Sequence, residues 1–109
     1  PSLELLQQTW DCGKSFPENV SEIEKTKLTE VKSKMIKSPK IKECFAKFEC
    51  KFVAEYEAGD HIIVIGEVVD IEIDESVLDN GKFNPKKANV LMHVGSERFA
   101  KIGDIVKAL

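Results

Sequence analysis

The first apolar residues of the chain follow the spacing of an α-helix. Within residues 2–12, Leu3, Leu6 and Trp10 fall on one helical face. Gly13 follows directly, and glycine is the residue most often found just past the end of a helix. The pattern therefore predicts a helix over residues 2–12, with a loop after it.

A second, short helix is predicted to begin at Ser21. Ser21 and Glu24 have the Ser-x-x-Glu spacing of a capping box, in which the two residues satisfy backbone N–H groups at the helix start. Residues 32–42 are rich in lysine and are interrupted by Pro39. We expect them to form a linking segment, with one short strand at about residues 31–36.

The middle of the chain changes to the period of a β-strand. From Phe48 to Tyr56, apolar residues alternate with mostly charged ones, which predicts a half-exposed strand. Residues 57–60 have the composition of a turn. The apolar segment from Ile62 to Ile73 is therefore expected to return as the antiparallel partner of a hairpin.

The Ile62–Ile73 segment has two halves with different patterns. The first half is apolar on both faces, whereas the second half alternates apolar residues with acidic ones. We therefore expect one end of this strand to be buried on both sides and the other end to be half exposed.

Turn signals divide the last part of the chain. Residues 79–81 (Asp-Asn-Gly) and 84–85 (Asn-Pro) are turn-forming sequences, residues 89–94 suit a short strand, and Gly95 ends it. Residues 99–109 carry apolar side chains at helical spacing, which predicts a final helix. The apolar residues of this helix are Phe99, Ile102, Val106 and Leu109.

Length and composition restrict the class of protein. A chain of 109 residues, 42% hydrophobic and 32% charged, has the size and composition of one globular domain. The order helix, helix, strands, helix indicates an α+β fold that is mainly β, or a small barrel. The net charge is −3 and the basic and acidic residues are mixed along the chain, so nucleic acid is not expected as a partner.

The sequence also predicts a cytoplasmic protein without a membrane partner. It contains no apolar run of the roughly 18 residues that a membrane-spanning helix needs, and no signal peptide. Its three cysteines lack Cys-x-x-Cys spacing, which favours a reducing compartment over a disulfide framework. We expect Cys12, Cys44 and Cys50 to be small buried residues and not metal ligands.

The stretch "GDHIIVIGEVVDIEI" contains three residues that are unusual in a buried strand. Gly66 indicates a bend or the close approach of another backbone. Glu67 requires a partner, for which a lysine across the sheet is expected. His61, at the start of the strand, either presents its ring to a pocket or caps the turn.

Together these residues resemble a known signature. "GDHIIVIGEVVDI" is similar to the G-D-H-x-x-x-x-G-x-V signature of the flavin reductase-like family, whose domains form an FMN-binding split β-barrel. Three flanking segments resemble that family in the same order: "PSLELLQQTWDCGKSFP", "SPKIKECFAKFECKF" and "LMHVGSERFAKIG". The resemblance implies that residues 1–109 are a single domain, the C-terminal part of a split barrel that is partly truncated at its N-terminus.

The resemblance also implies sites. His61 matches the signature histidine near the flavin or the nicotinamide donor, Phe99 matches an aromatic residue near the flavin, and His93 lies in the same motif. Each has a structural alternative, respectively a turn cap, a core anchor and a solvated loop residue. Trp10 either shields a flavin face or packs in the core as a helix-face aromatic.

The phosphate site departs from the family pattern. Many members have Asp-Lys-Phe where this chain has residues 21–23 (Ser-Glu-Ile), so the usual lysine is absent and a glutamate there would repel a phosphate. Lys14 and Ser15, in a loop after Gly13, offer a cation and a hydroxyl donor instead. The alternative is that Lys14 is an ordinary surface lysine.

Two classes of function follow from these observations. The resemblance implies an FMN-dependent oxidoreductase or a flavoredoxin-like electron carrier that uses NAD(P)H or a protein donor, in which the flavin performs the redox chemistry. It also implies a homodimer, and a cleaved or missing N-terminal segment that completes the barrel. The alternative is a non-catalytic small β-barrel fragment or interaction module without flavin.

Overall fold

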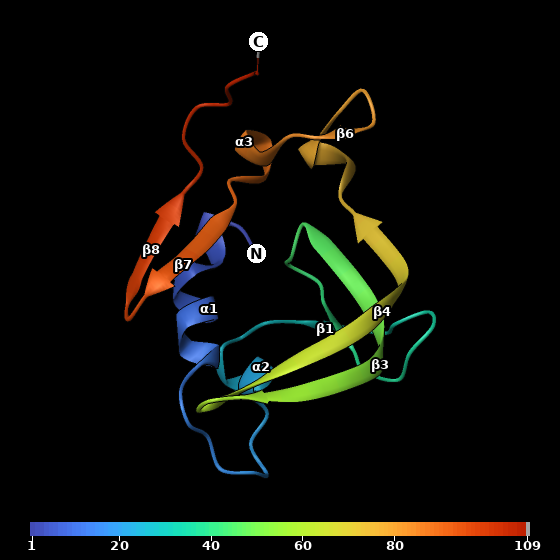
Figure 1. The fold of residues 1–109 in the computed structure, drawn as a ribbon, viewed down its shortest axis with the longest axis vertical. Helices are drawn as coiled ribbons and strands as arrows, with labels where there is room; N and C mark the ends of the chain where they lie inside the picture. Colours follow the sequence, from blue (N-terminus) through green and yellow to red (C-terminus); the bar gives the residue numbers. More distant parts are fainter. Residues whose placement is uncertain (109) are drawn as a thin grey trace.

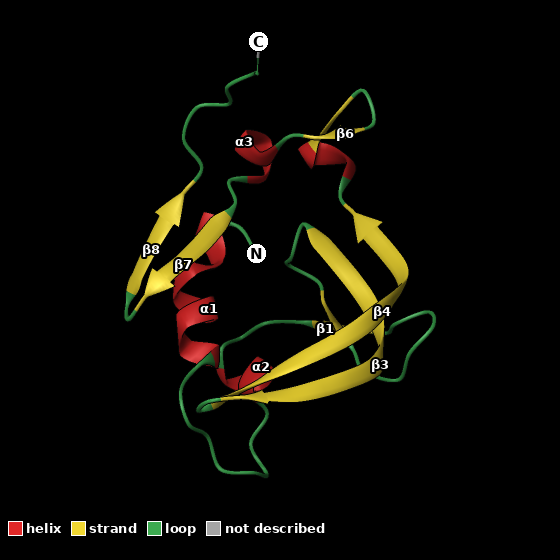
Figure 2. Cartoon of the chain, viewed as in Figure 1, coloured by secondary structure: helices red, strands yellow, loops and turns green. Residues whose placement is uncertain are grey.

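The computed structural model describes residues 1–108, which form short helices and four antiparallel strand pairs (Figures 1 and 2). Strands dominate, as the α+β prediction requires. In chain order the elements are η1 (Leu3–Leu5), α1 (Leu6–Cys12), α2 (Glu22–Lys25), β1 (Glu30–Val31), β2 (Lys40–Ile41), β3 (Ala46–Ala58), β4 (His61–Ile73), η2 (Glu75–Val77), β5 (Leu78–Asp79), β6 (Lys82–Phe83), α3 (Pro85–Ala88), β7 (Leu91–Gly95) and β8 (Arg98–Lys101).

The β3–β4 hairpin is the largest element, and its strands are paired as the alternating pattern predicts. Ala46 lies opposite Ile73 at the base, and Ala58 lies opposite His61 at the tip. Gly59 has a φ of 67°, a left-handed conformation that glycine adopts without strain, which allows the tight turn. The expected turn and hairpin are therefore confirmed.

Two irregularities shape this hairpin, and they explain Gly66. The register skips one residue of β4 after Glu49 and one residue of β3 after Phe52. Gly66 lies opposite Phe52, at the second irregularity, and a Cβ atom there would lie 3.1 Å from the Cβ of Cys50. The close approach that the sequence suggested is therefore an approach of β3 itself.

The N-terminal helices follow their sequence signals. η1 and α1 cover the predicted helix, and the N–H of Gly13 closes its end by donating to the carbonyl of Trp10. Ser21 caps α2 by accepting a hydrogen bond from the backbone N–H of Glu24 at 3.4 Å.

The Asn80-Gly81 turn also follows its sequence signal. Both residues have positive φ, 49° and 76°, and they join β5 to β6 as a two-residue hairpin loop. Asn84-Pro85 is different from the expected turn, because the side chain of Asn84 caps α3 by accepting hydrogen bonds from the N–H groups of Lys86 and Lys87. Pro85 occupies the first position of that helix.

The predicted helix over residues 99–109 is wrong. Residues 98–101 form β8, which pairs with β7, and residues 102–108 contain no helix or strand; Leu109 lies outside the described residues. Positive φ angles at Gly95 and Ser96 turn the chain back on itself, so hydrogen bonds to β7 override a helical spacing that covers few turns. The expected strand at 31–36 is limited to Glu30–Val31, and bends follow it.

The base of the β3–β4 hairpin buries its charged face and exposes its apolar face. Glu49 is 0% exposed and Lys47 is buried, because β2 and the segment before it lie against this face. On the opposite face Phe48 is 57% exposed, and its cross-strand neighbour Ile71 is exposed too. The predicted half-exposed strand is therefore present, but at this end of the hairpin the exposed face within residues 1–108 is the apolar one.

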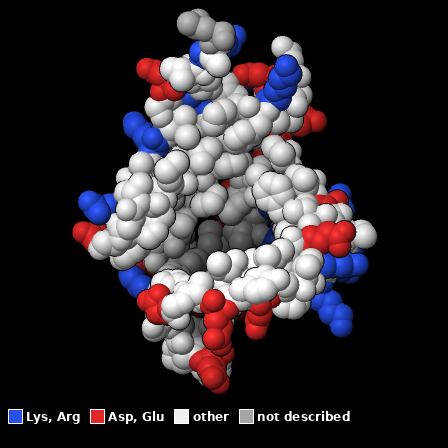
Figure 3. Space-filling view, viewed as in Figure 1, with Lys and Arg blue, Asp and Glu red and all other residues white. Residues whose placement is uncertain are grey.

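The tip of the hairpin is also open. Residues 61–68 are exposed, although their pattern predicts burial on both faces, and Cys50 is exposed and Cys12 and Cys44 are half-buried where burial was expected. The total exposed area is 8753 Å², whereas a compact chain of 12.2 kDa exposes about 6,100 Å². Figure 3 shows a hollow between α1 and β7 on one side and β4 on the other. Residues 1–108 therefore leave apolar strand surface that they do not cover themselves.

Candidate functional site

Three of the six residues expected at a flavin site form one aromatic cluster. The ring of Phe99 lies 6.3 Å from that of Trp10 in an edge-to-face arrangement and 5.0 Å from that of His93. His93 and Phe99 are cross-strand neighbours on β7 and β8, and Trp10 comes from α1. The fold thus joins the two ends of the chain at these rings.

Backbone contacts between the N-terminus and the residues before β7 hold α1 beside β7. The N–H of Leu3 donates to the carbonyl of Asn89 at 2.9 Å, and Ser2 forms an isolated bridge with Val90. Trp10 is 37% exposed and Phe99 is half-buried, so the cluster is packed yet reachable from solvent. Such a cluster can lie against a planar aromatic ligand.

The His93 ring is oriented by a backbone group. Its Nε2 lies 2.7 Å from the carbonyl oxygen of Ser96 in the β7–β8 turn. Because a carbonyl oxygen only accepts, Nε2 carries the hydrogen and Nδ1 is left as an acceptor when the ring is neutral. His93 is therefore fixed by the turn and not free to rotate as a solvated loop residue.

Lys14 and Ser15 lie in the exposed loop after α1. The Lys14 ammonium forms an ion pair of 2.5 Å with Asp11, one helical turn back. Lys14, and secondly Gln7, lower the pKa of the Asp11 carboxyl. A phosphate bound to Lys14 would therefore compete with Asp11 for the same cation.

His61 lies on a different hairpin from the aromatic cluster. It is the first residue of β4, at the hairpin tip, and its side chain is 81% exposed. Its Nδ1 lies 2.5 Å from a carboxylate oxygen of the adjacent Asp60. This contact between neighbours orients the imidazole at the tip without burying it.

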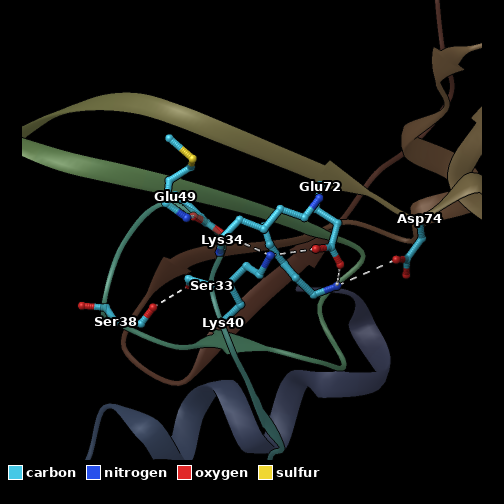
Figure 4. A network of polar contacts seen from close by, with 9 residues as sticks. Ser33, Lys34, Ser38, Lys40, Glu49, Glu72 and Asp74 are labelled. Atoms are coloured by element: carbon cyan, nitrogen blue, oxygen red, sulfur yellow. Dashed lines mark hydrogen bonds and ion pairs between the residues drawn. The ribbon is translucent and has the colours of Figure 1, made fainter.

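The sequence analysis missed a network of charged side chains at the base of the hairpin (Figure 4). Lys40 of β2 contacts Glu49 at 3.1 Å and Glu72 at 2.8 Å. Lys47 contacts Glu72 at 3.2 Å and Asp74 at 3.8 Å. The alternating charged residues of β3 and β4 were interpreted as a face exposed to solvent. In the structure β2 lies against this face, and Lys40 contacts both Glu49 and Glu72.

Glu49 is the centre of this network. Its two carboxylate oxygens accept hydrogen bonds from the backbone N–H groups of Lys34, at 2.8 Å, and Met35, at 2.6 Å. Burial alone would raise the pKa of Glu49, but these two donors and the Lys40 ammonium outweigh it and lower the pKa to about 2. Glu72 and then Glu49 raise the pKa of Lys40. The carboxylate and the ammonium are therefore charged at neutral pH.

An apolar hollow lies on the opposite face of the same hairpin. It has a volume of about 430 Å³. Phe45 and Phe83 stack beside it with ring centres 5.8 Å apart. Its lining residues are Phe45, Ala46, Phe48, Ile73, Phe83 and Val90.

Neither a metal centre nor a membrane segment is found in the part of the chain that the structure describes. Residues 1–108 contain no group of three or more His, Cys, Asp or Glu side chains placed to hold a metal ion. Their longest helix, α1, has 7 residues, and no helix among them has the length and apolar character needed to cross a bilayer.

The sequence pattern of the flavin reductase like domain matches residues 4–100. The chain belongs to the flavin reductase-like family. The match includes both ends of the aromatic cluster and the whole β3–β4 hairpin.

The chain is also similar in sequence to proteins of other organisms. A protein of Archaeoglobus fulgidus is 39% identical over 79 residues, which cover 72% of this chain and 45% of that protein. A protein of Methanothermobacter thermautotrophicus is 33% identical over 116 aligned positions, which cover 98% of this chain and 55% of that protein. The chain thus spans about half the length of the relatives it matches.

Solved structures of other proteins share the fold of this chain. Nitrilotriacetate monooxygenase component B from Bacillus cereus has a TM-score of 0.87 at 23% identity, over 98% of this chain and 56% of that chain. Flavoredoxin from Methanosarcina acetivorans has a TM-score of 0.82 at 25% identity, over 99% and 57%. An FMN-binding domain of a flavin reductase-like enzyme from Shewanella baltica has a TM-score of 0.78 at 19% identity, over 99% and 60%. The expected split-barrel fold is therefore confirmed.

Proposed function

We propose that this chain contributes the aromatic wall of an FMN site in a flavoprotein that passes electrons from NAD(P)H or a protein donor to an acceptor. The observation that carries the proposal is the Trp10–Phe99–His93 cluster, which lies inside the segment that matches the flavin reductase-like family. Its packed and partly exposed rings fit an aromatic cofactor.

The protein's part in this chemistry is placement. FMN, when bound, supplies the redox chemistry by accepting and passing on electrons. The rings of Trp10 and Phe99 restrict the position of a planar ring system, and the acceptor Nδ1 of His93 can receive one hydrogen bond from a ligand. Lys14 and Ser15 offer the phosphate a cation and a hydroxyl group.

The absorption spectrum of the purified intact protein tests this proposal. We expect a yellow protein whose chromophore is released on denaturation and is FMN by chromatography and mass. Titration of the flavin-free protein with FMN should also quench Trp10 fluorescence, a signal that the matched variant Trp10→Phe lacks. A colourless protein without affinity for FMN would overturn the proposal and favour the non-catalytic barrel.

We propose further that both faces at the tip of the β3–β4 hairpin are covered in the active protein, one by a segment beyond these residues and the other by a second copy of the chain. The support is the apolar character of both faces of the tip and the large exposed area of residues 1–108. Sedimentation of the intact protein should give the mass of a homodimer. A stable monomer at micromolar concentration would contradict the second copy.

We also propose that the protein works in a reducing cytoplasm. Cys12, Cys44 and Cys50 are free thiols in this structure, and such thiols persist where disulfides do not form. Alkylation of all three cysteines in protein taken directly from native cells would test this proposal, and a disulfide in that sample would contradict it.

A further inference from the structure

Residues 32–42, which we call the lysine loop, carry a charge opposite to that of the rest of the chain. They contain five lysines and no acidic residue, a charge of +5, whereas the whole chain has a net charge of −3. The remaining residues therefore carry −8. The loop runs from the end of β1 through β2, and the part between these strands projects from the side of the molecule opposite β7 and β8 in Figure 1.

The lysine loop is held in one shape by contacts with the hairpin. The buried carboxylate of Glu49 binds the backbone N–H groups of Lys34 and Met35, so it fixes the chain and leaves the side chains free. The hydroxyl of Ser33 donates to the carbonyl of Ser38 at 2.5 Å and closes the loop. A connection that only had to span β1 and β2 does not require a buried charge, because burying a carboxylate has a large desolvation cost.

The outer surface of the loop is cationic with an apolar centre. Lys40 points inward to Glu49 and Glu72 and is neutralised there. The other lysines are exposed, and none of them forms an ion pair with residues 1–108; they are Lys32, Lys34, Lys37 and Lys42. Met35 is 57% exposed among them, and methionine is an adaptable apolar contact at binding surfaces.

We propose that the lysine loop is a docking site for an acidic patch on a partner protein. A fixed loop backbone reduces the entropy cost of binding, and its lysines steer an oppositely charged partner during encounter. A long polyanion such as nucleic acid is disfavoured, because the loop contains no arginine or aromatic residue and the rest of the chain, at −8, would repel it. A compact acidic surface can contact the loop without meeting that charge.

Titration with a defined acidic probe tests the proposal in the intact protein, with or without flavin. The probe is a short synthetic peptide of alternating Glu and Leu, at low salt. The loop variant is K32Q/K34Q/K37Q/K42Q, and the matched control K51Q/K82Q/K101Q/K107Q removes four exposed lysines elsewhere. We expect the loop variant to bind the peptide about tenfold more weakly and the control to bind within about twofold of the parent.

Three outcomes would overturn the proposal. The first is an equal loss of peptide affinity in the loop variant and the control, which would mean that the loop is only one part of a solvated surface. The second is an oligonucleotide, or a vesicle containing phosphatidylserine, that binds through the loop more tightly than the peptide does. Where the fourfold loop variant does not fold, the single variants K34E and K37E replace it. The third outcome is then an unchanged affinity for the peptide in both single variants. Flavin content is measured separately by absorbance, so loss of the FMN proposal leaves this test intact.

Discussion

The carboxylate of Glu49 and the ammonium of Lys40 form an ion pair of 3.1 Å that is shielded from solvent. The pair joins β3 to β2, and the same carboxylate holds the backbone at Lys34 and Met35. One buried charge thus connects the largest hairpin with the lysine loop. Removing the Glu49 carboxylate leaves Lys40 with Glu72 alone and takes the acceptor from two backbone N–H groups, which is more costly than never burying the pair.

Glu49→Gln should lower the melting temperature of the protein by at least about 5 °C. Glutamine keeps the size of the side chain but offers a single acceptor oxygen and no charge to Lys40. The amides of residues 34 and 35 should also exchange with solvent faster than in the parent. Glu55→Gln, an exposed position on the same strand, is the matched control and should change neither quantity.

Acid should remove the contribution of Glu49 to stability. The pKa of this carboxyl is about 2 in the folded protein, below its ordinary value of 4.5. Because the unfolded state takes up the proton first, the contribution is complete above about pH 5 and is lost as the pH falls from 4.5 toward 2. Urea unfolding of the parent and of Glu49→Gln should therefore give a stability difference that narrows over this range. A difference that stays constant with pH contradicts the assignment.

Asp70→Asn should stabilise the protein by about 0.5–1 kcal/mol. Asp70 lies directly opposite Glu49 in the β3–β4 ladder, and its Oδ2 is buried without a hydrogen-bond partner in residues 1–108. The amide removes one of two like charges on the same face. Asp74→Asn, which weakens a contact with Lys47, is the comparison and should not stabilise. Chemical denaturation of both variants decides the matter, and a less stable Asp70→Asn protein refutes the argument.

Lys14→Ala should weaken FMN binding by up to about fivefold, and more at low salt, because ions screen a contact between charges. Asp11→Asn should have the opposite effect, since it releases Lys14 from its ion pair. Fluorescence titration with FMN and with riboflavin, which lacks the phosphate, measures both effects. Equal FMN affinity in the parent and in Lys14→Ala would contradict a phosphate site at Lys14 and make Lys25 or Lys27 the next candidate.

His61→Ala should leave the ligand-free protein as stable as the parent, because the side chain is exposed and its contact is with the neighbouring Asp60. If the hairpin tip meets the flavin or the nicotinamide, the variant should bind FMN or be reduced about two- to tenfold less well. Asp60→Asn keeps the His61 imidazole but removes the charge of its neighbour, so it separates the role of the ring from that of the His61–Asp60 contact. Lower thermal stability with unchanged flavin affinity and reduction rate would make His61 a structural residue.

Local sequence determined the elements whose information lies within a few neighbouring residues. The capped start of α2 at Ser21, the Asn80-Gly81 turn and the alternation of β3 each depend on side chains and backbone angles close in the chain. The signature around His61, together with three flanking segments in the same order, likewise predicted the family that the domain match shows. These features needed no knowledge of what packs against them.

Tertiary structure alone decided which faces are buried and which residues meet. The charged face of β3 is covered because β2 and the lysine loop bring Lys40 to Glu49 and Glu72, and no period in the sequence shows that contact. The final segment forms β8 and not a helix, because pairing with β7 satisfies its backbone groups. That same pairing places Phe99 against Trp10 from the opposite end of the chain. Hydrophobic patterns report the period of a segment, whereas burial depends on the partner that the rest of the fold supplies.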